Sequence, residues 1–290
     1  MRHVLRARRL AGSKTPQPGA ELFVLRSGCL ATMSEQWEFY PSQLGENQAF
    51  IFYDHGIRDE INGLALPNAL KIRVLFHSPT DAGLPTNDEF RQLSALEDVL
   101  TRHVQKLGGA YVGRVTFAGA RYFHCFVSFA EDTAERVLRQ ISAESGYKLQ
   151  FVLNPDPEKK TYWEELFPTP REWQTVQDMK VLDVLKDHGD DPSVTRRIDH
   201  WLYFRDSSGR DAFNAWALGN GFVIQNLSDP EDVNGDYGIQ IYHHARPELQ
   251  VITSTTQLLW DSARELGGSY DGWETSVENP SAGGAPDLAS

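Results

Sequence analysis

Cysteine is scarce in this sequence, which has two, Cys29 and Cys125, in a chain of 290 residues. Two cysteines are too few for a disulfide framework or a cysteine-rich zinc site, and such usage is typical of a reducing compartment. Cys125 stands in an aromatic run, where a small buried side chain is the expected role. We therefore expect a cytoplasmic protein.

Long hydrophobic runs are also missing, since no stretch of about 18 apolar residues occurs. The sequence therefore predicts no membrane-spanning helix and no membrane partner. A phosphate-binding loop, a dinucleotide-binding glycine pattern and a Gly-x-Ser-x-Gly elbow are absent too. These absences lower the expectation of an enzyme and predict no cofactor.

Histidine is present without the spacing of a metal site. It lies next to a second possible ligand in Asp54-His55, Asp199-His200 and His243-His244. Neighbours on a strand point to opposite faces, and no His-x-His or His-x-x-x-His spacing supplies two ligands from one element. We expect no bound metal.

Positive charge is scarce in the last part of the chain. Residues 169–290 hold nine Lys and Arg against 20 Asp and Glu, a net charge of −11, and residues 34–168 hold 13 against 19, a net charge of −6. An acidic surface repels phosphate backbones, because nucleic-acid affinity rests on Lys and Arg. Direct nucleic-acid binding is therefore disfavoured, and the charge either suits a basic protein partner or serves solubility.

The first 33 residues carry the opposite charge, with six Lys and Arg and one Glu. They lack the apolar core and cleavage site of a secretory signal, although their low acidity is also found in transit peptides. We expect this leader, 1–33, to be disordered or not translated, with Met33 as the true start. The tail, 279–290, is rich in Gly, Pro, Ser and Ala and is expected to be disordered.

Hydrophobic periodicity predicts a first α+β domain over residues 34–168. Thr86 and Glu89 form a capping box before an amphipathic helix that Gly108-Gly109 ends. A polar, proline-rich stretch near 155–170 marks the domain boundary. The expected strands are 49–53, 70–76, 111–117, 121–129 and 147–153, with a second helix at 131–145.

The same order of elements is predicted again in a second domain over residues 169–278. Thr169 as N-cap, Pro170 and Glu172 start a helix that runs to about residue 187. Strands are then expected at 198–205, 222–227, 237–245 and 270–277, and helices at 208–218 and 255–266. Both domains have the order βαββαβ, so the predicted fold class is α+β, with two tandem ferredoxin-like antiparallel α/β sandwiches.

The densest group of aromatic residues lies in the predicted strand Asp199-His-Trp-Leu-Tyr-Phe204. Alternation places Trp201 and Tyr203 on the open face of the sheet, where Tyr242 can join them. RNA-recognition modules stack bases on such aromatic residues. The same residues can pack under the helix at 172–187 or meet a protein, and the scarcity of basic neighbours favours this covered or protein-binding interpretation.

Two carboxylates, Asp271 and Glu274, follow in the last predicted strand. With His200 they can supply acid–base chemistry, so a hydrolytic enzyme stays an alternative, although Asp271 beside Gly272 is more typical of a turn or bulge. No catalytic residue is predicted. The candidate partner-binding residues are Asp199, His200, Trp201, Tyr203, Tyr242, Tyr270, Asp271, Trp273 and Glu274.

A family resemblance joins these motifs. Gly189-Asp-Asp, Asp199-His-Trp-Leu-Tyr-Phe, Gly221-Phe and Gly267-Gly-Ser-Tyr-Asp-Gly-Trp-Glu-Thr occur in this order, and the segment of about 172–277 resembles the regulator of ribonuclease E activity B family. The resemblance implies a small ferredoxin-like domain that binds ribonuclease E and inhibits it, which alters messenger RNA turnover.

The preceding part of the chain resembles another family. Residues 37–167, which open with Trp37-Glu-Phe-Tyr-Pro, look like an uncharacterised domain that occurs fused in front of this regulator. We therefore expect a non-catalytic regulator that binds ribonuclease E, or another RNA-degradation component, through an acidic surface. An RNA-binding module that uses the aromatic sheet face and a hydrolytic enzyme with a carboxylate and histidine site are the alternatives.

Overall fold

The computed structural model describes residues 4–6, 36–230 and 235–279. The chain divides into two compact units: an N-terminal unit that ends at Glu172, and a C-terminal unit that starts at Trp173 and also includes the residues before position 19. Each unit is a mixed α+β fold with its own antiparallel sheet. No helix in the described part is long and apolar enough to cross a membrane.

One short strand, β1 (Val4–Arg6), lies within the leader 1–33. It pairs antiparallel with β11 (Gly268–Ser276) of the second unit, a pairing that no pattern in the sequence indicates. The other residues of the leader, and the tail after Asn279, lie outside the described residues. The expectation of disorder there stays a prediction.

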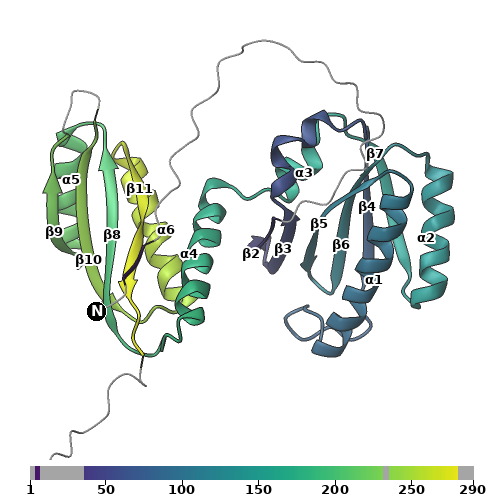
Figure 1. Cartoon of the computed structure of the whole chain (residues 1–290), viewed down its shortest axis with the longest axis horizontal. Coiled ribbons are helices and arrows are strands. Elements are labelled where there is room, and N and C mark those ends of the chain that lie inside the picture. The colour runs from purple at the N-terminus through teal and green to yellow at the C-terminus, as the bar shows by residue number, and fades with distance from the viewer. Residues whose placement is uncertain (1–3, 7–35, 231–234, 280–290) are drawn as a thin grey trace, which may run out of the picture. The chain divides into compact units, whose positions relative to one another are not determined.

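The N-terminal unit is built on a six-stranded sheet (Figure 1). Its strands are β2 (Trp37–Leu44), β3 (Asn47–Asp54), β4 (Asn68–Leu75), β5 (Ala110–Phe117), β6 (Ala120–Val127) and β7 (Leu149–Pro155). Its helices are α1 (Asn87–Lys106), α2 (Glu131–Ser145) and α3 (Lys160–Glu165), with two 3-10 turns, Gly56–Asp59 and Ile61–Gly63. The strand order is β2-β3-β5-β6-β4-β7. Periodicity predicted all of these strands and helices except β2 and α3.

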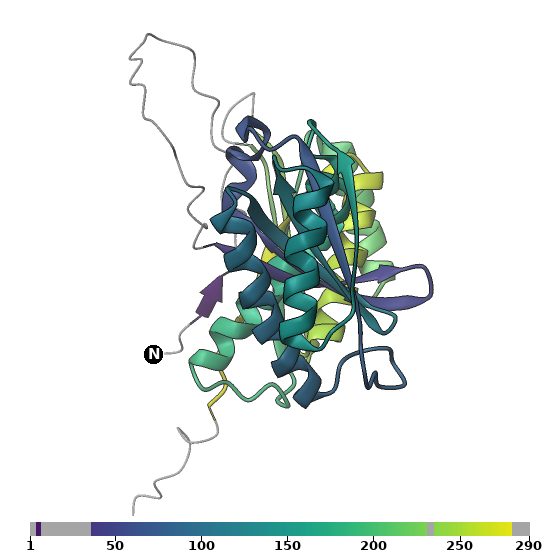
Figure 2. The same cartoon turned by 90° about the vertical axis from the view of Figure 1, so that its right-hand side faces the viewer.

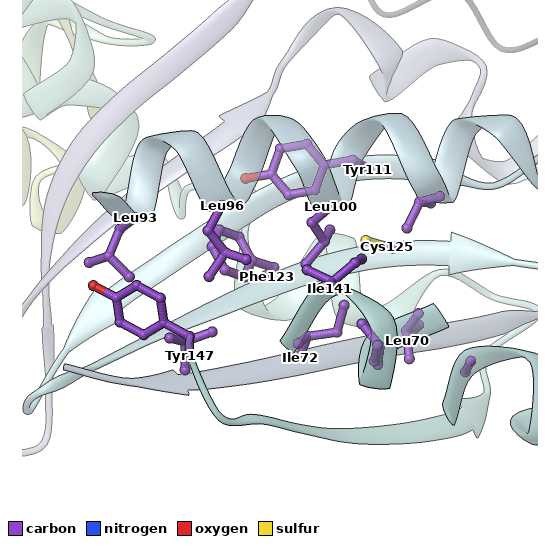
Figure 3. Packing of buried hydrophobic residues seen from close by; sticks show 14 of the residues in the cluster. Leu70, Ile72, Leu93, Leu96, Leu100, Tyr111, Phe123, Cys125, Ile141 and Tyr147 are labelled. Carbon is purple, nitrogen blue, oxygen red and sulfur yellow. The ribbon is translucent and has the colours of Figure 1, made fainter. Parts of the chain in front are cut away.

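Helices α1 and α2 lie side by side on one face of this sheet (Figures 1 and 2). The start of α1 is as predicted, because the hydroxyl of Thr86 accepts a hydrogen bond from the N–H of Glu89. Figure 3 shows the buried cluster beneath the helices, in which Leu100 of α1 packs with Phe123 and Cys125 of β6. The expected burial of Cys125 is confirmed.

The segment around α3 covers the opposite face of the same sheet. Tyr162 of α3 is buried, and its hydroxyl donates to the carbonyl of Asp54 at 2.7 Å. Tyr40 of β2 is buried too, and its hydroxyl donates to the carbonyl of Leu166 at 2.9 Å. Gly113 of β5 permits this close packing, since a Cβ there would lie 3.1 Å from Cδ1 of Leu166. Both faces of the N-terminal sheet therefore carry buried side chains.

The C-terminal unit is built on a five-stranded sheet in the order β1-β11-β8-β10-β9. Its helices are α4 (Pro170–Asp187), α5 (Ser207–Gly219) and α6 (Leu249–Glu265), and its other strands are β8 (Arg196–Phe204), β9 (Val223–Ser228) and β10 (Tyr237–Ala245). Each predicted element is present. Helix α6 begins at Leu249, earlier than the predicted residue 255.

Helices α5 and α6 cover one face of the C-terminal sheet (Figure 1). The core between them and the sheet contains Leu202 and Phe204 of β8, Phe213 of α5 and Leu259 of α6, all fully buried. The other face has no described helix packed on it, and we call it the open face. Alternation along β8 is the reason that one face is apolar and the other is mixed.

Helix α4 packs beside α6 at the helix-covered face. Its Val181 and Leu185 share a buried cluster with Ile198, Ile252 and Trp273. Within that contact, Asp178 of α4 accepts hydrogen bonds from Nε1 of Trp273 at 3.0 Å and from the hydroxyl of Thr256 at 2.5 Å. The interpretation that this helix covers Trp201 and Tyr203 is therefore wrong, because Asp178 anchors it to the opposite face.

Candidate functional site

The open face of the C-terminal sheet carries the aromatic residues of β8. Leu202 is buried under the helices, whereas Trp201 and Tyr203 are partly exposed on the open face, as alternation predicts. Gln240 of β10 lies opposite Trp201, and Gly238 lies opposite Tyr203. Trp201 therefore stands beside a polar side chain, and Tyr203 stands beside a residue without a side chain.

A hollow is formed on the open face by β8, β10 and β9. Its lining consists of Trp201, Tyr203, Asn226, Ser228, Gly238, Ile239 and Gln240. Gly238 keeps it open, because a Cβ there would lie 2.3 Å from Oγ of Ser228 and 3.5 Å from Cε1 of Tyr203. The residues that line it contribute aromatic rings, amides and a hydroxyl, and none of them is charged. Such a lining suits a flat group with hydrogen-bond donors.

Two residues of β8 beside the hollow neutralise each other. Nε and Nη2 of Arg197 donate to the two carboxylate oxygens of Asp199 at 2.8 and 2.5 Å, and this hydrogen bonding raises the pKa of Arg197. The guanidinium carbon of Arg197 lies 3.9 Å from the ring centre of Tyr242. Gln240 donates from Nε2 to Asp199 at 3.1 Å. The open face thus already holds one guanidinium against an aromatic ring and a carboxylate.

A second arginine near the hollow is engaged in the same way. Nη1 of Arg210, on α5, donates to the carboxylate of Asp229 at 2.6 Å and to the carbonyl of Ser228 at 3.3 Å. Nη2 of the same guanidinium donates to Asp211 at 3.1 Å. The cations that flank the hollow on β8 and α5 are therefore committed to carboxylates of the chain itself.

Beneath the sheet, His200 makes buried polar contacts that the sequence does not predict. Its Nδ1 lies 2.9 Å from the hydroxyl of Tyr270, and its Nε2 lies 3.1 Å from Nδ1 of His243. Burial lowers the pKa of His200 well below its usual value, and the neighbouring His243 adds to the shift. A neutral His200 therefore supports the sheet from the helix-covered side and does not face a partner.

A β-bulge in β11 decides where the remaining candidate residues point. The pairing of β11 with β8 shifts at Asp271, the position predicted to be a turn or bulge. Because of the extra residue, Tyr270 and Trp273 both lie on the helix-covered side and are fully buried. Glu274 lies on the open face, opposite Asp199.

The structure therefore separates the predicted site residues into two groups. Those on the open face are Asp199, Trp201, Tyr203, Tyr242 and Glu274, whereas His200, Tyr270 and Trp273 lie beneath it and Asp271 sits at the bulge. His200 and Glu274 are on opposite faces of the sheet, so the acid–base pair of the hydrolase alternative is not brought together.

Other residues of this surface were absent from the sequence prediction. They are Arg197, Asn226, Ser228, Gly238 and Gln240. The signal that could have found them is register, because a strand paired with β8 must place its residues opposite Trp201 and Tyr203. Across the described ranges, no group of three His, Cys, Asp or Glu side chains is placed to hold a metal ion.

Comparison with known proteins assigns the two units to separate families. Residues 176–275 match the family model "Regulator of ribonuclease activity B", and residues 35–167 match a "Family of unknown function (DUF695)". A regulator of ribonuclease activity B from Actinobacillus succinogenes is 28% identical over 116 residues, which are 39% of this chain and 81% of that protein. Its counterpart from Xenorhabdus nematophila is 27% identical over 117 residues, which are 40% of this chain and 83% of that protein.

Likeness to solved structures is weak. An unknown protein from Galdieria sulphuraria has a TM-score of 0.20 at 11% identity, over 72% of this chain and 98% of that one, which is too low to assign a fold. The assignment therefore rests on sequence. The part of the chain that carries the hollow matches the model of the regulator of ribonuclease activity B family, and it follows a part that matches a family of unknown function.

Proposed function

We propose that this chain is a non-catalytic, protein-binding regulator of a ribonuclease, with ribonuclease E or a related RNA-processing protein as its partner. The observation that carries the proposal is the hollow beside Trp201 and Tyr203, because it lies on the open face of the domain that matches the regulator family. Both curated relatives are named regulators of ribonuclease activity. The open face is the surface that we assign to the contact with the enzyme.

Trp201 and Tyr203 have the properties of interface anchors. Binding energy at protein interfaces is concentrated in a few residues, among which Trp, Tyr and Arg are enriched. The two rings are partly buried before any partner binds, so little rotamer freedom is left to lose on association. A partner that covers the hollow would therefore gain apolar burial at a low entropic cost.

The remaining candidate residues take two roles in this proposal. Asp199, Tyr242 and Glu274 would form the polar rim around the aromatic centre, as in other protein interfaces. His200 and Trp273 would hold the sheet in shape from below, since both are fully buried. Loss of a buried residue would weaken binding only by disturbing the sheet.

The charge of the C-terminal part supports a basic partner. Residues 169–290 carry a net charge of −11, and complementary charge speeds encounter and selects partners. Two arginines near the hollow, Arg197 and Arg210, are already paired with carboxylates. The surface around the hollow is therefore better suited to bind cationic groups of a partner protein than to bind a phosphate chain.

RNA binding is the second candidate, and one observation favours it: Trp201 and Tyr203 stand on an uncovered sheet face, where bases could stack. The acidic charge opposes it, because RNA affinity needs cations that release counterions. If the chain binds RNA at low salt and Trp201→Ala abolishes that binding, this second candidate is favoured.

We further propose that both units are ferredoxin-like sandwiches within 34–168 and 169–278. The order β4-α1-β5-β6-α2-β7 and the order β8-α5-β9-β10-α6-β11 support this, since each places its first strand between its third and its last. The scarcity of cysteine supports a cytoplasmic location.

A cleavage assay with purified ribonuclease E and the full-length chain tests the function. We expect the chain to bind the enzyme and to slow cleavage of a short RNA, Trp201→Ala to relieve this inhibition, and Tyr122→Ala to leave it intact. Tyr122 is a suitable control because it is a partly buried tyrosine on a strand of the other unit. Absence of binding and of any change in cleavage would overturn the proposal.

A further inference from the structure

We infer that two copies of this chain associate through strand β9, at the edge of the C-terminal sheet, in an antiparallel pairing that joins the two sheets. The inference goes beyond the proposed function and does not depend on which protein the open face binds. It concerns the edge of the sheet, whereas the proposed function concerns the open face.

Strand β9 lies at one end of the C-terminal sheet, and among the described residues only β10 pairs with it (Figure 1). At the other end of the sheet, β1 covers β11. An edge strand presents unpaired backbone N–H and C=O groups, which can bind a further strand. Every residue of β9 except Ile224 is exposed, so helix α5 leaves this edge accessible.

The sequence of β9 lacks the residues that commonly protect an edge strand. Val223-Ile-Gln-Asn-Leu-Ser228 holds no charged residue, proline or glycine. By contrast, the edge strand β2 of the N-terminal sheet contains Glu38 and Pro41. Two apolar side chains of β9 are also exposed, Val223 at 45% and Leu227 at 42%. An edge of this composition favours pairing with another strand.

A bulge in β9 puts two of its apolar side chains on the same side of the sheet. The pairing of β9 with β10 shifts at Gln225, which is the extra residue. On one side of the bulge, Ile224 pairs with Ile241, and on the other Leu227 pairs with Ile239. Both residues of β10 are buried beneath the helices. Because directly paired residues share a face, Ile224 and Leu227 both lie on the helix-covered side.

The other residues of β9 belong to the open face. Val223, Asn226 and Ser228 pair with residues of β10 that lie on this face. Gln225 joins them, because its amide oxygen accepts a hydrogen bond from Nη2 of Arg197 at 3.1 Å. Two apolar side chains therefore stand on one side of the strand, and mainly polar ones stand on the other.

These faces select one register for a pair of identical strands. With the twofold axis between Gln225 and Asn226, Ile224 of each copy lies opposite Leu227 of the other, and both are on the helix-covered side. The remaining residues then meet on the open face. Moving the axis by half a residue places Ile224 opposite Asn226 or Ser228, whose side chains point to the other face. Strand β9 is thus complementary to itself in this register, as an isologous interface requires.

The charges at the end of β9 stay apart in this register. Arg210 of α5 binds two carboxylates there, Asp211 and Asp229. Asp229 would lie opposite the uncharged Phe222 of the second copy. The two copies of Asp229 would therefore be about 20 Å apart, beyond the Debye length of about 8 Å at physiological salt. The exposed Arg205 follows β8, and β10 separates that strand from β9.

The pairing would change what the open face offers to a partner. Because paired residues share a face, the open faces of both copies would lie on the same side of one continuous sheet. Two hollows would then be presented together, and a partner with two binding segments would gain avidity. The number of hollows available would depend on the concentration of the chain.

Sedimentation velocity of the full-length chain over about 5–300 µM tests the inference. We expect a reversible dimer with a dissociation constant on the order of 10–100 µM, because a pair of six-residue strands makes a small interface. Residues 169–290 carry a net charge of −11 in each copy, so salt should strengthen the dimer by screening this repulsion. An association built on ion pairs would weaken instead.

A charged side chain at the edge should break the dimer. Leu227→Lys places an ammonium beside Ile224 of the second copy and should raise the dissociation constant by about tenfold or more. Leu75→Lys is the matched control, because Leu75 is an exposed leucine on a strand of the other unit, and it should change nothing. Circular dichroism melting curves show whether both variants keep the fold.

A cross-link tests the register even if Leu227→Lys unfolds. Asn226 is next to the twofold axis, so Asn226→Cys should bring two thiols together across α-carbons about 6 Å apart. In a Cys29→Ser background, mild oxidation of this variant should give a disulfide-linked dimer. Leu75→Cys in the same background should stay monomeric.

A chain that stays monomeric up to about 300 µM at high salt, or a dimer that Leu227→Lys leaves intact in its folded form, would overturn the inference. If the monomeric chain binds ribonuclease E and Leu227→Lys weakens that binding, the edge receives a strand of the partner instead, and self-pairing is wrong. Failure of the proposed function is distinguishable. A dimer that leaves ribonuclease E unaffected supports the inference alone, and a monomer that inhibits ribonuclease E through Trp201 supports the function alone.

Discussion

The two units follow the same order of strands and helices but differ in whether the second face of the sheet is covered. In the N-terminal unit, α1 and α2 cover one face, and the segment around α3 covers the other through Tyr162 and Leu166. In the C-terminal unit, α4, α5 and α6 all belong to one face, and Trp201 and Tyr203 stay partly exposed on the other. The segment around the six-residue helix α3 thus buries the aromatic residues on the second face of the N-terminal sheet.

This difference separates two uses of aromatic residues. A covered aromatic such as Tyr162 contributes its burial to folding, whereas Trp201 can still be covered by a partner. Truncation should therefore cost stability in the N-terminal unit and binding in the C-terminal unit.

The largest expected effect is on the covered face. Tyr162→Ala should lower the free energy of unfolding of the N-terminal unit by about 3–5 kcal/mol, because it removes a fully buried ring and the partner of the Asp54 carbonyl. Urea unfolding of the full-length chain measures this loss. Tyr203→Ala is the matched change on the open face, and it should cost about 1 kcal/mol. Equal losses of unfolding free energy in the two variants would contradict the difference between the covered and the open face.

The next effect tests what keeps α4 off the open face. Asp178→Ala should destabilise the C-terminal unit by about 2–4 kcal/mol, because the N–H of Trp273 and the hydroxyl of Thr256 lose their buried acceptor. Thermal unfolding measures the loss. Partner affinity below the melting temperature should be unchanged, and a loss of affinity as large as that of Trp201→Ala would show that the two faces do not act separately.

Binding should respond to the open face alone. Trp201→Ala is expected to weaken the affinity for the partner by about 2 kcal/mol, which is roughly 30-fold, with about 1 kcal/mol or less of lost stability. Isothermal titration calorimetry with ribonuclease E measures the affinity. A variant that loses as much stability as Tyr162→Ala would place Trp201 among the core residues instead.

The effect that is smallest at pH 7, and that grows with acid, concerns a histidine on the covered face of the N-terminal sheet. Burial lowers the pKa of His124 to about 3, with a further contribution from Lys71, and neither ring nitrogen has a hydrogen-bond partner among the described residues. In the unfolded chain the His124 imidazole is protonated below about pH 6.5, whereas in the folded chain it stays neutral. The free energy of unfolding therefore falls as the pH drops below that value. The expected slope for this group is about 1.4 kcal/mol per pH unit, down to the folded pKa.

His124→Phe checks that slope. The variant should be at least as stable as the parent at pH 7, because no hydrogen bond is lost, and less sensitive to acid between pH 6 and pH 4. Urea unfolding across this range gives both slopes. Parallel pH dependences of variant and parent would mean that His124 titrates normally in the folded chain.

Local sequence signals predicted most of the elements. The capping box at Thr86, the glycine at position 146 after α2 and the alternation through Trp201 depend on neighbours in the chain, so the corresponding helices and the open face were found. The short helix α3 follows Lys159 in a left-handed conformation and is held by distant contacts to Asp54. Such contacts leave no local pattern.

Register is the other feature that the sequence could not supply. Strict alternation would put Tyr270 and Glu274 on one face and Trp273 on the other, but the bulge at Asp271 buries Tyr270 and Trp273 together. The location of α4 was missed for a similar reason, because it depends on the buried contact between Asp178 and Trp273. The candidate residues therefore lie on both faces of the sheet and at the bulge.

Hydrogen exchange of the full-length chain, with and without purified ribonuclease E, tests the central claim most directly. If the open face binds the partner, slower exchange will be confined to β8, β9 and β10 around the hollow, and the N-terminal sheet will exchange as before. Protection that avoids these strands, or lies only in the N-terminal unit, would contradict the account.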